Sequence, residues 1–254
     1  MPRRLPTDTR ERGGEASQNR SVILPVLCLA AHVALAQVAE PAAFSRPLVK
    51  LFEAQWPNNR QVTIVCHGHS VPAGYAKTPV VDSLNAYPHL LFEEIKRRYP
   101  YAVVNVIVTA VGGEASDAGA ARFERDVMSL KPDVVTIDYG LNDRGIGLEK
   151  AKAAWEKMIA TAQKGGAEVI LLTPSWDLSA HPADANDPLA QQARQIRELA
   201  DRYHCGLADS LAAFIQASQA GTDMNALMAQ VNHPNRAGHE LILKGLLPWF
   251  GITR

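Results

Sequence analysis

Short apolar segments alternate with longer segments of helical periodicity along most of this 254-residue chain. The short segments are rich in valine and isoleucine and predict strands at residues 61–66, 101–109, 133–139, 167–173 and 205–208. The spacing of apolar residues predicts helices at residues 86–98, 117–130, 148–164, 188–203, 211–217 and 236–250. Such alternation is typical of a parallel sheet covered by helices on both faces. We therefore expect an α/β protein, a three-layer α/β/α sandwich with a flavodoxin-like five-stranded parallel sheet.

The N-terminal segment has the pattern of an export signal. Residues 1–20 carry five arginines against three acids, and residues 21–36 carry no charge and end in Ala34-Leu35-Ala36. This order predicts a secretory signal peptide at 1–36, and hence a secreted or periplasmic protein with no stable membrane insertion after cleavage. An uncleaved anchor or a buried helix is the alternative. We expect an irregular, proline-containing lead-in at 37–59 and one domain at 60–254.

Composition excludes several classes of protein. The chain has 26 basic and 26 acidic side chains, which argues against a protein that binds nucleic acid. Its three cysteines are too few for a disulfide scaffold. Cys66 and Cys205 could pair in an oxidising compartment, but their apolar, strand-like surroundings favour free buried thiols. Beyond the N-terminus no apolar run is long enough for a membrane span, which excludes a multi-span membrane protein.

Residues that could take part in catalysis follow the predicted strands. Ser70 follows the first strand, Gly112 and Gly113 follow the second, and Asn142 follows the third, while His233 precedes the last helix. In parallel sheets of this kind ligands bind beyond the carboxyl ends of the strands. We therefore expect a serine, a glycine, an asparagine and a histidine to meet at one rim of the sheet.

Acyl transfer requires this set of groups. A serine oxygen is a weak nucleophile until a base such as histidine takes its proton. The oxyanion that then forms needs hydrogen-bond donors aimed at it. A glycine N–H, an asparagine amide and the N–H of the serine itself supply them, with Gly112 an alternative to Gly113.

With these motifs in order, the chain resembles the SGNH hydrolases, also called the GDSL esterase/lipase superfamily. The resemblance covers nearly all of residues 61–250 and rests on Gly68-His69-Ser70, Gly113, Gly140-Leu141-Asn142-Asp143 and His233-Pro234-Asn235. It implies that Ser70 is the nucleophile, that His233 is the general base, and that Ser70, Gly113 and Asn142 form the oxyanion hole. It also implies a carboxylic ester hydrolase that needs no cofactor and no metal.

Two positions depart from the family pattern. The family usually has aspartate before the serine and aspartate three residues before the histidine, whereas this chain has His69 and Gln230. Because a carboxylate normally orients the imidazole, His233 requires another partner. The alternatives are a backbone carbonyl, the Gln230 side chain as a possible orienter, or a distant acid such as Asp209 or Asp223. We predict a Ser–His dyad in which no carboxylate contacts His233 Nδ1.

Other residues near these motifs have plainer interpretations. Asp143 is expected to be structural, and Arg144 to pair with a nearby acid. Tyr75 and Trp176 either line the substrate cleft or belong to the core, and residues 178–188 are expected to form a surface loop near the site.

The sequence thus favours a secreted serine esterase acting on short-acyl or acetyl esters of a small molecule or a glycan through an acyl-serine intermediate. Three alternatives remain. The first is a metal-dependent hydrolase that uses His67 and His69, with Asp138 or His233 as a further ligand. The others are an acyltransferase on the same scaffold and a non-catalytic glycan-binding relative.

Overall fold

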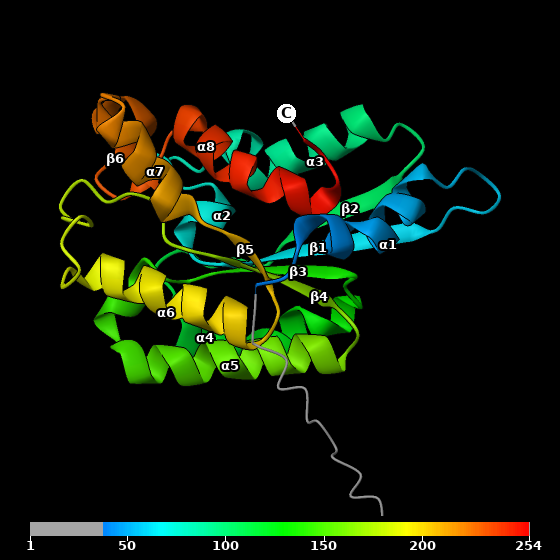
Figure 1. Cartoon of the computed structure of the whole chain (residues 1–254), viewed down its shortest axis with the longest axis horizontal. Coiled ribbons are helices and arrows are strands. Elements are labelled where there is room, and N and C mark those ends of the chain that lie inside the picture. Colours follow the sequence, from blue (N-terminus) through cyan, green and yellow to red (C-terminus); the bar gives the residue numbers. More distant parts are fainter. Residues whose placement is uncertain (1–37, 254) are drawn as a thin grey trace, which may run out of the picture. The chain divides into compact units, whose positions relative to one another are not determined.

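The computed structural model describes residues 38–253, which form a sheet with helices on both of its faces (Figure 1). The predicted signal peptide lies outside the described residues. The helices and strands are α1 (Pro41–Glu53), β1 (Gln61–Gly68), α2 (Ser70–Ala73), α3 (Tyr87–Arg98), β2 (Val103–Val108), α4 (Ser116–Asp126), β3 (Val134–Asp138), α5 (Leu148–Lys164), β4 (Glu168–Leu172), α6 (Pro188–Arg202), β5 (Gly206–Ala208), α7 (Ser210–Gln219), β6 (Met228–Gln230), β7 (His233–Pro234) and α8 (Arg236–Leu246).

The main sheet has five parallel strands in the order β2-β1-β3-β4-β5. This is the flavodoxin-like order, so the predicted fold is confirmed. Strand β1 lies between β2 and β3, with Cys66 opposite both Val108 and Thr136. The segments that follow these three strands therefore emerge at the same edge of the sheet.

The helices divide into two layers. Figure 1 shows α3, α7 and α8 on one face of the sheet and α4, α5 and α6 on the other. Each layer buries its own core: one cluster includes Leu91 and Phe214, and the other includes Phe123 and Trp155. Strands β1, β3 and β4 contribute side chains to both cores, which explains their nearly continuous apolar sequences.

The expectation of an irregular lead-in was wrong for residues 41–53, because this segment forms helix α1. Pro41 stands in the first turn, where a missing N–H removes no helical hydrogen bond. Phe44, Leu48 and Phe52 follow at four-residue spacing and are buried in the same core as α3 and α8. Burial of this stripe outweighs the cost of the internal Pro47, so the helix belongs to the domain.

Among residues 38–253, no helix is both long enough and apolar enough to cross a bilayer.

Candidate active site

Ser70 stands at the carboxyl end of β1, on the turn into the short helix α2. The backbone N–H of His69 donates to the Asp138 carbonyl at 3.2 Å, which fixes this turn to the end of β3. His69 is also the N-cap of α2, because its Nδ1 accepts the Val71 N–H at 3.2 Å. Ser70 is the first residue of α2, so its own N–H has no acceptor within the helix.

His233 reaches Ser70 from the other end of the chain. The antiparallel pair β6–β7 carries His233 immediately before α8. Its Nε2 lies 2.9 Å from Ser70 Oγ, although the two residues are 163 positions apart in sequence. Both side chains are buried. The structure thus brings together the serine and the histidine that the sequence indicated, at the distance that proton transfer requires.

The other ring nitrogen of His233 contacts two groups, and neither is a carboxylate. Nδ1 lies 3.0 Å from the Ala76 carbonyl oxygen and 2.7 Å from Gln230 Nε2. The two distant acids serve elsewhere: Asp209 pairs with Arg197, and Asp223 caps the turn at Asn225. Within the described residues, the partners of His233 Nδ1 are therefore a side-chain amide and a backbone carbonyl.

The environment of His233 disfavours its charged form. Burial lowers the pKa of the imidazole below its ordinary value, the hydrogen bond to the Ala76 carbonyl raises it, and the nearby His69 lowers it. The net direction is downward. His233 therefore remains neutral, as a general base must be, to lower pH than an exposed histidine does.

Gly113 and Asn142 lie on two segments that are hydrogen-bonded to each other, and the first segment is also bonded to the end of β1. The Val111 N–H donates to the Gly68 carbonyl at 3.0 Å, and the Glu114 N–H closes a turn onto the Val111 carbonyl. Gly113 has φ +78° at the third position of this turn, a conformation that favours glycine. Asn142 Nδ2 donates to the Glu114 carbonyl at 2.9 Å, so one amide N–H remains for another acceptor.

A partly buried ionic network supports this turn and was not predicted. Arg122 Nε lies 2.8 Å from Glu114 Oε1, and the Tyr139 hydroxyl donates to Glu114 Oε2 at 2.7 Å. Tyr139 also lies 3.1 Å from His67 Nε2. These side chains come from four separate segments, so only their assembly in three dimensions could have identified the network.

Asp143 is structural, as the sequence suggested. Its carboxylate accepts the Ser116 N–H at 2.8 Å and the Trp155 indole N–H at 2.7 Å. The neighbouring Arg144 pairs with Asp177 at 2.7 Å, which confirms the expected ion pair. Both interactions anchor the segment that carries Asn142.

His67 and His69 do not converge on a common point that a metal would occupy. His67 Nδ1 lies 2.9 Å from Thr109 Oγ1, and its Nε2 contacts Tyr139 and the Gly119 carbonyl. His69 instead faces the Ser70 turn and Asp138. Over residues 38–253, no three His, Cys, Asp or Glu side chains are grouped as metal ligands. The donor arrangement therefore gives no support to the metal-hydrolase alternative.

Tyr75 borders the site, whereas Trp176 belongs partly to the core. The Tyr75 ring centroid lies 5.9 Å from that of His233. A Cβ on Gly112 would stand 2.7 Å from Tyr75 Cζ, so glycine at this position lets the ring approach the turn before Gly113. Trp176 packs against the core that includes α3 and α8.

The chain is similar to known esterases in sequence and in fold. Residues 66–241 match the GDSL-like Lipase/Acylhydrolase family. An acetylxylan esterase of Geobacillus stearothermophilus is 23% identical over 166 residues, which cover 61% of this chain and 75% of that protein. The crystal structure of Axe2, an acetylxylan esterase from Geobacillus stearothermophilus, matches with TM-score 0.65 and 22% identity over 76% of this chain and 95% of that chain.

LAE5, an alpha/beta hydrolase enzyme from the metagenome of Lake Arreo, Spain, matches with TM-score 0.64 and 24% identity over 79% of this chain and 98% of its own. Three similar structures are described as catalytic mutants of Axe2, in which a serine, a histidine or an aspartate is replaced by alanine. That aspartate lies three residues before that histidine.

Proposed function

The chain belongs to the GDSL-like lipase/acylhydrolase family and is a carboxylic ester hydrolase, and we propose that it acts through an acyl-serine intermediate on Ser70. The observation that carries this proposal is the 2.9 Å separation between Ser70 Oγ and His233 Nε2. An activated serine requires a base at this distance.

In the proposed acylation step, His233 Nε2 takes the proton of Ser70 as Oγ attacks the ester carbonyl carbon. The Ala76 carbonyl accepts the proton on Nδ1 and so favours the ring form whose Nε2 is free to act as base. The tetrahedral oxyanion accepts hydrogen bonds from the Ser70 and Gly113 N–H groups and from the second amide N–H of Asn142. The protonated His233 then gives its proton to the departing alcohol.

Deacylation repeats the same steps with water as the nucleophile. His233 Nε2 takes a proton from water, which attacks the acyl carbonyl, and the proton passes to Ser70 Oγ as the acid is released.

We propose short acyl esters, especially acetyl esters of carbohydrates, as the substrates. The similarity to acetylxylan esterases supports this class. The aspartate of Axe2 precedes its histidine by three residues, and this chain has Gln230 at the same distance from His233. We therefore propose the same reaction carried out with a different partner for the imidazole.

Two measurements test the reaction. A fluorophosphonate probe should label Ser70, and mass mapping of the labelled peptide should identify it. Acetate release from a nitrophenyl acetate and from acetylated xylan should be abolished in Ser70→Ala and retained in Ser218→Ala, a serine on α7 away from the site. Labelling elsewhere, or full turnover by Ser70→Ala, would refute the serine mechanism.

We also propose that the protein is exported. The uncharged segment 21–36 after an arginine-rich start supports this proposal. Expression in a bacterial host with a functional export system should yield an extracytoplasmic protein whose N-terminus, by mass spectrometry, is Gln37. Retention of the intact N-terminus inside the cell would contradict export.

A further inference from the structure

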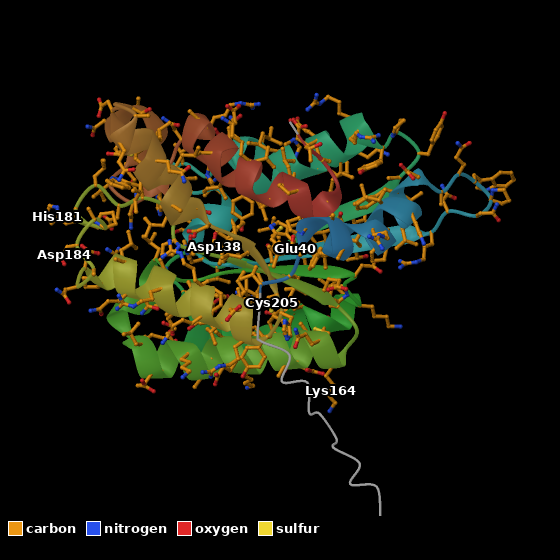
Figure 2. The ribbon with its side chains drawn as sticks, in the orientation of Figure 1. Glu40, Asp138, Lys164, His181, Asp184 and Cys205 are labelled. Atoms are coloured by element: carbon orange, nitrogen blue, oxygen red, sulfur yellow. The ribbon has the colours of Figure 1, made fainter. Side chains whose placement is uncertain are left out.

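Two imidazoles lie within reach of Ser70 Oγ, and among residues 38–253 only that of His69 is paired with a carboxylate. His233 Nε2 lies 2.9 Å from the oxygen, and His69 Nδ1 lies 3.5 Å from it. His69 Nε2 in turn lies 3.4 Å from Asp138 Oδ1. The His69 and Asp138 side chains are only 1% and 4% exposed, and Figure 2 labels Asp138 between the two helix layers.

The two groups at His233 Nδ1 make opposite demands on its proton. The Ala76 carbonyl oxygen can only accept a hydrogen bond, so it requires a proton on Nδ1. The Gln230 Nε2 group can only donate, so it requires a lone pair on Nδ1. A neutral imidazole satisfies one of these partners at a time.

The orientation of the Gln230 amide is determined by a third group. The Thr78 N–H donates to Gln230 Oε1 at 3.0 Å. Rotating the amide by half a turn would place its NH₂ against the Thr78 N–H, two donors facing each other. Gln230 therefore presents Nε2 to His233, and at 2.7 Å it is nearer to Nδ1 than the Ala76 oxygen at 3.0 Å.

The proton position on His69 is also determined by its surroundings. The Val71 N–H donates to His69 Nδ1 at 3.2 Å, so Nδ1 carries a lone pair. The neutral ring then has its proton on Nε2, which faces the Asp138 carboxylate. Its Nδ1 is consequently a second acceptor near Ser70, 3.5 Å from Oγ and separate from His233.

We propose that the resting site holds Ser70 in an unreactive arrangement of protons, and that Gln230 is the positioning residue that stabilises it. Gln230 donates to His233 Nδ1, His233 Nε2–H donates to Ser70 Oγ, and the Ser70 proton points toward His69, which faces Asp138. Esterolysis requires the other tautomer of His233, with its proton on Nδ1 donated to Ala76. The two tautomers contain the same number of protons, so Gln230 changes only their relative populations. This inference rests on the proposed role of Ser70 and His233.

Two substitutions at Gln230 test this inference, and its partial exposure allows both to fold. Gln230→Met keeps the length of the side chain and removes the donor, so Ala76 alone selects the tautomer. We expect kcat to rise about fivefold, the effect of one net hydrogen bond on an equilibrium. Gln230→Glu accepts from both Thr78 and His233 Nδ1, and we expect a larger rise. Gln216→Glu adds the same charge on the exposed side of α7 and should leave kcat unchanged.

Nitrogen NMR of protein labelled with ¹⁵N-histidine reads the tautomer without reference to activity. In the wild type, the His233 signals should be those of the Nε2–H form, and in Gln230→Glu those of the Nδ1–H form. A wild-type ring protonated on Nδ1, or a lower kcat in Gln230→Met, would overturn the inference. Failure of the proposed function gives a different result, because Ser70→Ala would then retain activity whatever the tautomer of His233.

Discussion

Among single residues, His233 combines a buried ring with partners that are not charged. Because its pKa lies below the ordinary value of about 6.5, the ring loses its extra proton at lower pH than a histidine in water does. We predict that kcat/KM falls on the acid side with a midpoint below pH 6.5 and is constant near neutrality. Initial rates on nitrophenyl acetate between pH 4 and 9 measure this. Activity recovered after return to pH 7.5 controls for unfolding, and a midpoint above pH 7 would contradict the prediction.

Asn142 allows a test of the oxyanion hole. One N–H of its amide is bound to the Glu114 carbonyl, and the other is available to the substrate. Replacing it with alanine removes a donor that acts on the transition state. We expect Asn142→Ala to lower kcat by about 100- to 1000-fold with little change in KM. Asn186→Ala, in the exposed loop before α6, is the matched control. A loss in kcat below about tenfold would show that Asn142 is not an oxyanion donor.

Among the helices and strands, those with a regular apolar pattern could be predicted from the sequence. Strand β1 and helix α5 were located to within two residues, since each repeats its apolar pattern over several turns or alternations. Helix α1 was missed because Pro41 and Pro47 outweighed the stripe that begins at Phe44. In the site, Ser70 and His233 were identified from their motifs. Ala76 was not, because it acts through its backbone carbonyl and its side chain carries no signal.

Helix α1 leads to a prediction about stability. Phe52 is fully buried, and its ring centroid lies 5.2 Å from that of Tyr99. Phe52→Ala leaves a cavity beneath the helix and should lower the free energy of unfolding by about 3–5 kcal/mol. Urea unfolding followed by circular dichroism measures the change. Trp56→Ala, at a position 85% exposed just after the helix, should change it by less than about 1 kcal/mol. Equal effects of the two substitutions would mean that α1 contributes little to the core.

In the domain as a whole, the sheet separates two cores, and each core contains one buried cysteine and one buried histidine. Cys66 belongs to the core on the α3 side and Cys205 to the core on the α5 side, so the sheet keeps the two thiols apart and both are free. Burial raises the pKa of each thiol to about 12. A buried histidine likewise lies on each side, His239 beside Tyr87 and His67 beside Phe123. Both faces of the domain therefore contain groups that resist ionisation.

These two histidines predict how stability depends on pH. Burial lowers the pKa of His67 to about 4 and that of His239 to about 3, well below the value in an unfolded chain. The unfolded chain therefore binds more protons below about pH 6.5, and each histidine lowers the free energy of unfolding by about 1.4 kcal/mol per pH unit from there toward its folded pKa. Above pH 6.5 both histidines are neutral in the folded and the unfolded chain, so neither lowers the free energy of unfolding. Urea unfolding at pH 7.5, 6 and 5 should show this decline.

His239→Asn, which keeps an acceptor for the Tyr87 N–H, should reduce the slope by one histidine's share, while His181→Asn in an exposed loop should leave it unchanged. A slope identical in His239→Asn and wild type would mean that His239 does not remain neutral in the folded domain.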